Sequence, residues 1–207
     1  MFNIELWLTF TIACLALNIS PGPGSILTIG KGISQGRIAA IVVALSIGLA
    51  TLLHVLVATF GLTLLIHTSK VAFLIVKSVG AIYLIWIGLR IVLKRNLVSF
   101  GALKKESLGR IFITGFLTAA LNPRVGIFVL AFIPQFVDPE VGSVTVQMIL
   151  YGIWFAFLSV LVLSLMGAFS TSLSRWLEER PRYVAGLNIG AGLMFLLSGL
   201  SVATISL

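Results

Sequence analysis

Charged residues are scarce in this sequence, too few to cover the surface of a water-soluble protein. Only 10% of the 207 residues are charged, whereas a soluble domain carries roughly 25%. Hydrophobic residues make up 59% of the chain, and they fall in long blocks that leave no room for a separate soluble domain. We therefore predict an all-α integral membrane protein.

Cysteine, histidine and nucleotide-binding motifs are also rare or missing. The single Cys14 excludes an intramolecular disulfide and a CxxC redox pair. His54 and His67 are the only histidines, so we expect no histidine-rich metal site and no cofactor. The sequence contains neither a phosphate-binding loop nor a Ser–His–carboxylate set. An enzyme is therefore not expected, and transport would be passive or driven by an ion gradient.

The net charge of +8 is high enough for a nucleic-acid-binding protein, but its distribution argues against that partner. The basic residues lie in short connections between apolar blocks, as the positive-inside rule predicts. The basic set consists of Lys31, Arg37, Arg90, Lys94, Arg95, Lys104, Lys105, Arg110, Arg175, Arg180 and Arg182. The opposite connections hold only Lys70 and Lys77. We therefore predict that the basic connections are cytoplasmic and that both termini are periplasmic.

The apolar blocks predict six transmembrane helices, at about 4–30, 38–66, 70–93, 110–134, 144–172 and 183–205. No Lys or Arg precedes the first block, so we expect a retained helix rather than a signal peptide. The polar stretch 96–109 is predicted to be a cytoplasmic linker between a first three-helix repeat, 1–95, and a second, 110–207. Because three is odd, the halves would insert in opposite orientations, as an inverted repeat requires.

The first predicted helix of each half is interrupted by proline. The interruptions are Asn18-Ile-Ser20-Pro21-Gly22-Pro23-Gly24 and Asn122-Pro123-Arg124. Ser20-Pro21 and Asn122-Pro123 each combine a capping residue with a first-turn proline, which predicts that a helix restarts there. Such a start presents free N–H groups and a positive dipole end, which suit a carboxylate. A single break would be an ordinary proline kink, but paired breaks are typical of a transporter site.

Several short motifs, taken together, resemble the LysE/RhtB-type amino-acid exporters. In chain order they are Pro21-Gly-Pro-Gly24, Ser34-Gln35-Gly36-Arg37, Lys77-x-x-Gly80-Ala-x-Tyr83-Leu84, Leu121-Asn122-Pro123 and Phe132-Ile-Pro134-Gln135-Phe136-Val-Asp138-Pro139. The resemblance covers essentially the whole chain. It implies a carrier of the bacterial inner membrane that exports amino acids or close derivatives in exchange for protons.

The chain departs from this family in one charged position. The family commonly has lysine after the Asn-Pro pair, where this sequence has Arg124. Arginine stays charged and can hold a carboxylate through two hydrogen bonds, whereas lysine can titrate. Whether Arg124 keeps the role of that lysine is left open.

We predict that a small amino acid binds between the two interruptions. The predicted binding residues are Asn18, Ser20, Pro21, Gly22, Pro23, Gly24, Asn122, Pro123 and Arg124. The two half-helix starts and Arg124 would hold the carboxylate. No Asp or Glu lies in the centre of a predicted span, so carbonyls freed at the breaks, with Asn18 and Asn188, would accept the ammonium.

Other residues allow two interpretations each. His54, the only imidazole deep in a predicted span, could couple transport to protons or simply pack. Gln135 and Asp138, at the outer end of the fourth span, could gate the path and contact the ammonium, or Asp138 could cap its loop. Gly32 and Gly36 fit a small-xxx-small pattern that serves packing within one subunit or in a homo-oligomer.

Two other function classes remain as alternatives to a carrier in the lipid bilayer. A membrane redox or thiol carrier is disfavoured because the sequence has no CxxC pair. A non-catalytic membrane subunit is disfavoured because paired broken helices would be a needless cost in a scaffold.

Overall fold

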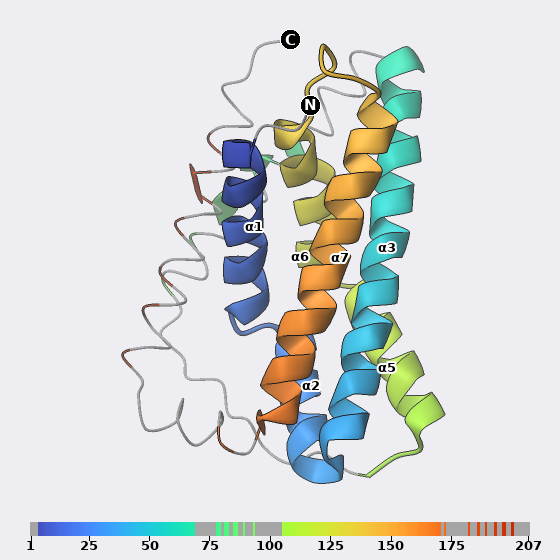
Figure 1. The fold of residues 1–207 in the computed structure, drawn as a ribbon, viewed down its shortest axis with the longest axis vertical. Helices are drawn as coiled ribbons and strands as arrows, with labels where there is room; N and C mark the ends of the chain where they lie inside the picture. Colours follow the sequence, from blue (N-terminus) through green and yellow to red (C-terminus); the bar gives the residue numbers. More distant parts are fainter. Residues whose placement is uncertain are drawn as a thin grey trace.

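The computed structural model describes residues 4–68 and 105–170 continuously, with isolated positions between 78 and 93 and between 172 and 200. In these two continuous ranges every element is helical (Figure 1). The elements are α1 (Ile4–Ile19), α2 (Pro23–Gln35), α3 (Arg37–Thr68), α5 (Leu108–Ala120), α6 (Pro123–Ile127), the π-helical turn η1 (Phe128–Phe132), the 3-10 turn η2 (Ile133–Phe136) and α7 (Val144–Ala168).

The described helices include two to four candidate membrane spans. Two segments, Arg37–Gly61 and Val144–Ala168, are each 25 residues long and apolar enough to cross a membrane. Two bent pairs could each form one broken span: α1 with α2, bent by 57°, and α5 with Arg124–Phe136, bent by 53°. These four correspond to the predicted first, second, fourth and fifth spans. The predicted spans 70–93 and 183–205 lie outside the continuously described residues, so the six-helix inverted repeat stays a prediction.

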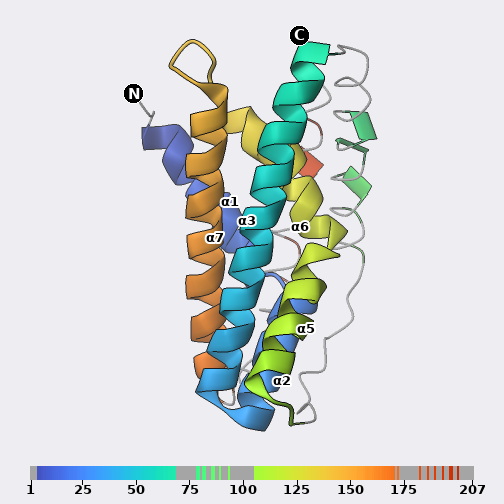
Figure 2. The ribbon, with the colours of Figure 1, turned by 90° about the vertical axis from the view of Figure 1, so that its right-hand side faces the viewer.

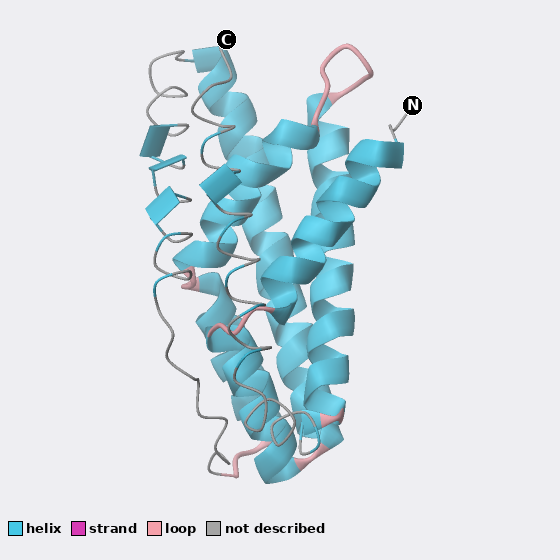
Figure 3. Cartoon of the chain, turned by 90° about the vertical axis from the view of Figure 1, so that its left-hand side faces the viewer, coloured by secondary structure: helices cyan, strands magenta, loops and turns pink. Residues whose placement is uncertain are grey.

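The long helices α3 and α7 lie side by side, and the two bent pairs flank them. Figure 1 shows α1 above α2 and α6 above α5, and Figure 2 shows the same order from the side. Both breaks therefore fall at mid-height, where Figure 3 draws them as short loops between helices. A break at this depth must be buried by protein or line a polar cavity, because lipid cannot satisfy its backbone groups.

Glycines allow the helices of the lower half to approach closely. A Cβ at Gly32 in α2 would clash with the carbonyl oxygen of Gly167 in α7, and one at Gly115 in α5 would clash with the hydroxyl of Ser46 in α3. Such small residues drive helix association in membranes because lipid supplies no hydrophobic force between helices. Gly32 therefore serves packing within this chain, whereas a Cβ at Gly36 would meet nothing within 4 Å.

Aromatic rings fill the upper half of the bundle, between α1, η1, η2 and α7. The Phe10 ring lies 4.8 Å from Tyr151 and 5.1 Å from Phe136, both edge to face. Phe128 stacks on Phe132 at 4.5 Å. Phe155 of α7 joins this cluster at 4.9 Å from Phe128. Ring pairs at these distances add attraction beyond burial, so they bind α1 to the second broken pair.

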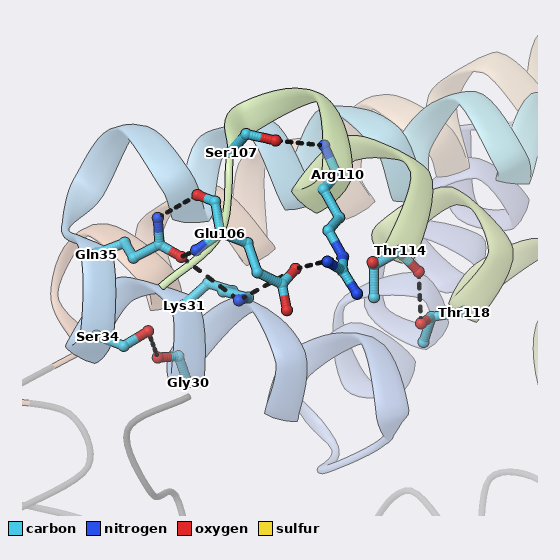
Figure 4. A network of polar contacts seen from close by, with 9 residues as sticks. All are labelled: Gly30, Lys31, Ser34, Gln35, Glu106, Ser107, Arg110, Thr114 and Thr118. Atoms are coloured by element: carbon cyan, nitrogen blue, oxygen red, sulfur yellow. Dashed lines mark hydrogen bonds and ion pairs between the residues drawn. The ribbon is translucent and has the colours of Figure 1, made fainter. Parts of the chain in front are cut away.

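A polar network ties the end of the predicted linker to α2 (Figure 4). The side chain of Gln35 donates to the carbonyl of Glu106 at 2.6 Å and accepts from the backbone N–H of Glu106 at 2.7 Å. The Nζ atom of Lys31 lies 3.6 Å from Glu106 Oε2, although Lys31 is only 2% exposed. The half-buried Glu106 carboxylate offsets the charge of the buried Lys31, and together with the Gln35 hydrogen bonds it holds residue 106 beside α2.

Candidate functional site

The first break separates α1 from α2 within the predicted interruption, but α2 begins two residues later than predicted. Gly22, in an extended conformation, precedes Pro23 as the first residue of α2. The hydroxyl of Ser25 accepts from the N–H of Gly22 at 2.8 Å and donates to its carbonyl at 3.0 Å. The prediction of Ser20 as the cap and Pro21 as the first helical residue is therefore wrong. Of the two prolines, Pro23 takes the first helical position because Ser25 closes the turn from inside α2.

Ser20 does not cap α2, because Gly22 holds that position. Its side chain is buried, at 2% exposure, and its Oγ has no hydrogen-bond partner among the described residues. A buried hydroxyl without a partner is costly. Such a group commonly marks a position where a water or ligand binds.

The second break confirms the predicted helix start. The side-chain oxygen of Asn122 accepts from the backbone N–H of Arg124 at 3.0 Å, and Pro123 is the first residue of α6. The carbonyl of Asn122 accepts from Val125 at 3.2 Å and from Gly126 at 3.3 Å. Asn122 thus satisfies the first amide groups of this five-residue helix. The start of α6 therefore presents no free N–H groups of the kind that the sequence predicted.

Arg124 joins the two breaks. Its guanidinium donates to the carbonyl of Leu17 at 3.2 Å and to that of Pro21 at 3.4 Å. A Cβ at Gly22 would lie 2.8 Å from Arg124 Nη1, so the absence of a side chain at this position lets the guanidinium approach. Arg124 therefore neutralises carbonyls left at the end of α1, and it places a positive charge between the two breaks.

A cavity of about 50 Å³ lies where the two breaks meet. Seven of the nine predicted binding residues line it: Asn18, Ser20, Gly22, Pro23, Gly24, Asn122 and Arg124. Pro21 is not among the lining residues, and the side chain of Pro123 lies outside the described part of the structure. The structure adds residues that the sequence analysis did not single out: Leu17, Ser25, Ile47, Thr51, Ala119, Val125, Phe155, Ser159 and Leu163. The cavity is therefore closed by α3 and α7 as well as by the broken helices.

Two polar residues that the structure adds to the cavity could not be recognised from the sequence. Thr51 in α3 and Ser159 in α7 are hydroxyls in apolar helices, and so are Ser46 and Thr59, which do not line the cavity. The neighbouring sequence does not distinguish the two hydroxyls that line the cavity from the two that do not. Only the packing of α3 against α7 shows which hydroxyls reach the space between the breaks.

Among the other predicted residues, His54, Gln135 and Asp138 are described by the structure and do not line the cavity. His54 Nε2 is 3.1 Å from the carbonyl of Ala119, so the ring lies beside the second break. Gln135 donates to the carbonyl of Ala131 at 2.9 Å. Asp138 accepts from the N–H of Glu140 at 2.9 Å and so caps its own loop. Asn188 lies outside the described residues.

The described residues contain no cluster of three or more His, Cys, Asp or Glu side chains that could hold a metal ion. Cys14 is fully buried in the apolar core beside Phe10. The polar groups that the described residues bring to the breaks are hydrogen-bonding groups and the charge of Arg124.

Comparisons with known proteins find a translocator family and relatives named as efflux proteins. The sequence matches the family described as LysE type translocator over residues 15–206. It is 29% identical over 205 residues to a homoserine/homoserine lactone efflux protein of Salmonella typhi, covering 98% of each chain. It is 31% identical over 180 residues to a leucine efflux protein of Salmonella choleraesuis, covering 81% of each chain. No solved structure matches the chain.

Proposed function

The chain belongs to the family of LysE type translocators, and from this premise we propose that it exports amino acids or close derivatives across the bacterial inner membrane. Its relatives are named as efflux proteins for homoserine and for leucine, and the family consists of transporters, not enzymes. The observation that carries the proposal is the convergence of two broken helices on one cavity, with Arg124 spanning both breaks. Broken helices that meet at mid-membrane are the usual construction of a carrier's substrate site.

The substrate carboxylate is placed at the start of α2, next to Arg124. Gly24 and Ser25 lie in the first turn of this 13-residue helix, where N–H groups have no partner within the helix. Both residues line the cavity, and the helix dipole adds positive potential there. The unpartnered hydroxyl of Ser20 supplies a further donor. At the second break, Asn122 holds the start of α6 and with it the backbone of Arg124.

Transport is proposed to run as proton antiport, with His54 as the coupling residue. Its Nε2 faces the carbonyl of Ala119. A carbonyl only accepts, so Nε2 is the donor in this contact. Ala119 also lines the cavity. A change at His54 would therefore alter the contact with Ala119, a residue that lines the proposed substrate cavity.

We expect purified protein in proteoliposomes to exchange L-homoserine or L-leucine in counterflow and to accumulate it when a pH gradient is imposed. His54→Ala and His54→Gln should both lose most of the gradient-driven accumulation but keep counterflow, because neither alanine nor glutamine can take up a proton in place of the imidazole. Glutamine can still donate to Ala119, so recovery of accumulation in His54→Gln alone would show a structural role. Absence of counterflow of either amino acid in the wild type would contradict the proposed function.

The orientation follows from the charge asymmetry of the connections and is tested independently of transport. We expect an alkaline phosphatase fused after residue 207 to be active, because the termini are placed in the periplasm. The same enzyme fused near residue 100 should be inactive, because the basic linker 96–109 is placed in the cytoplasm. The reverse pattern of activities would overturn the orientation of every element.

A further inference from the structure

We infer that Thr51 and Ser159 bind the substrate's ammonium group. The inference rests on the proposed function and assigns the groups that bind the other charge of the substrate in the same cavity. An ammonium brought out of water must find hydrogen-bond acceptors, yet the described lining residues include no Asp or Glu. The acceptors must therefore be neutral oxygens.

Both hydroxyls have already used their single proton. Thr51 Oγ1 donates to the carbonyl of Ile47 at 2.9 Å, and Ser159 Oγ donates to the carbonyl of Phe155 at 2.8 Å. A hydroxyl has one donor and two acceptor lone pairs, so each oxygen can now only accept. Both side chains are buried at 1% exposure and line the cavity. An oxygen in this state selects a ligand that donates.

Asn18 adds a third acceptor of the same kind. Its side-chain amide donates to the carbonyl of Cys14 at 2.8 Å, which orients the group and leaves its oxygen to accept. Asn18, Thr51 and Ser159 come from α1, α3 and α7, so acceptors reach the cavity from three helices. Three acceptors match the three N–H bonds of an ammonium.

The donors of the cavity come from other residues. The start of α2 and the guanidinium of Arg124 can only donate. The cavity therefore has groups that select a carboxylate and groups that select an ammonium. This pairing fits an α-amino acid zwitterion better than it fits a carboxylic acid, an amine or an uncharged lactone.

The test measures binding of L-leucine and of 4-methylpentanoate, which has the same carbon skeleton without the amine, to purified protein. Thr51→Val and Ser159→Ala should each weaken leucine binding by about tenfold or more, the scale of a lost hydrogen bond to a charged group. Binding of 4-methylpentanoate should change by less than about twofold, because that ligand makes no such bond. Thr51→Ser, which keeps the oxygen, should retain most of the leucine affinity.

Matched controls come from buried hydroxyls that do not line the cavity. Thr59 lies in the same helix as Thr51 and is replaced in Thr59→Val, and Ser46→Ala removes a buried hydroxyl that donates to the carbonyl of Val43. Neither control should change leucine binding.

Three results would contradict these proposals. Equal loss of affinity for leucine and 4-methylpentanoate in Thr51→Val and Ser159→Ala, or no loss for either ligand, would overturn the assignment of the ammonium site. Wild-type protein that binds leucine and 4-methylpentanoate equally would also overturn it while leaving the carboxylate site standing. Failure of the wild type to bind L-leucine or L-homoserine would instead contradict the proposed function.

Discussion

L-Leucinamide is expected to bind at least about tenfold more weakly than L-leucine, because the amide removes the negative charge that the start of α2 and Arg124 would hold. The helix start offers backbone N–H groups and the positive end of its dipole. The guanidinium lies next to Gly22, the residue that precedes this start. All of these groups prefer an anion to a neutral amide. Competition of both compounds against labelled leucine measures the difference directly.

Arg124→Gln should lower the affinity for leucine by about 1.5–3 kcal/mol, the contribution of a charge-assisted hydrogen bond. Arg124 also holds the carbonyls of Leu17 and Pro21, so a loss of affinity alone could reflect a displaced break. The ratio of acid to amide affinity separates these causes. We expect the ratio to fall in Arg124→Gln, whereas a displaced break would weaken acid and amide alike and leave the ratio unchanged.

Two further variants sharpen this experiment. Asn122→Ala should weaken leucine binding as well, because loss of an N-cap frees the start of the helix that positions Arg124. Arg110→Gln is the matched control, since this arginine is exposed and lies in the network around Glu106, away from the cavity. Equal affinity of the wild type for leucine and leucinamide would show that the breaks do not hold a carboxylate.

Gly32→Ala is expected to destabilise the protein by about 1–3 kcal/mol, as overpacking of a tight core contact does. The new Cβ would meet the carbonyl oxygen of Gly167 and the side chain of Ser170. A backbone oxygen cannot move aside as a flexible side chain can, so α2 and α7 would have to separate. Because α2 forms part of the cavity wall, the loss of stability should be accompanied by loss of leucine binding. Thermal unfolding in detergent measures the stability.

The same substitution at Gly109 should have the opposite sign. Gly109 is an exposed position in α5 where a Cβ would meet nothing within 4 Å. Gly109 is the second residue of α5, where alanine gains only part of the roughly 0.5–1 kcal/mol by which it is favoured over glycine in the middle of a helix, so Gly109→Ala should raise the unfolding temperature slightly. Equal changes in the unfolding temperature for Gly32→Ala and Gly109→Ala would show that the close approach of α2 and α7 does not contribute to stability.

The polar network around Lys31 illustrates how a charge can be misjudged from sequence. Lys31 was counted among the residues of the basic connections, which are expected to face water. In the structure it is buried at 2% exposure and paired with Glu106, 75 positions further along the chain. Its contribution to a cytoplasmic charge excess is therefore smaller than its presence in the sequence suggests. The remaining basic residues of the linker region still support the proposed orientation.

Features that depend on a few neighbouring residues could be predicted from the sequence by itself. Asn122 caps the helix that begins at Pro123, as expected, because capping is decided by groups two or three positions apart. The long apolar segments of α3 and α7 were predicted for a similar reason: length and hydropathy alone determine whether a helix can cross a membrane. The first break was found but misplaced, because Ser20-Pro21 and Gly22-Pro23 both fit a helix start, and the hydroxyl of Ser25 favours the second.

Features that join distant segments appear only in the tertiary structure. Arg124 donates to Leu17, 107 positions away, and no local pattern says which carbonyl this arginine will reach. Thr51 and Ser159 became candidate binding residues only because α3 and α7 present them to the same cavity, whereas Ser46 and Thr59, of the same chemical kind, face elsewhere. Likewise the sequence does not show that a side chain at Gly32 would meet α7, whereas one at Gly109 would meet nothing within 4 Å. The physical reason is that hydrogen bonding within a turn is set by neighbours along the chain, whereas the partner of a side chain across a helix interface is set by how whole helices pack.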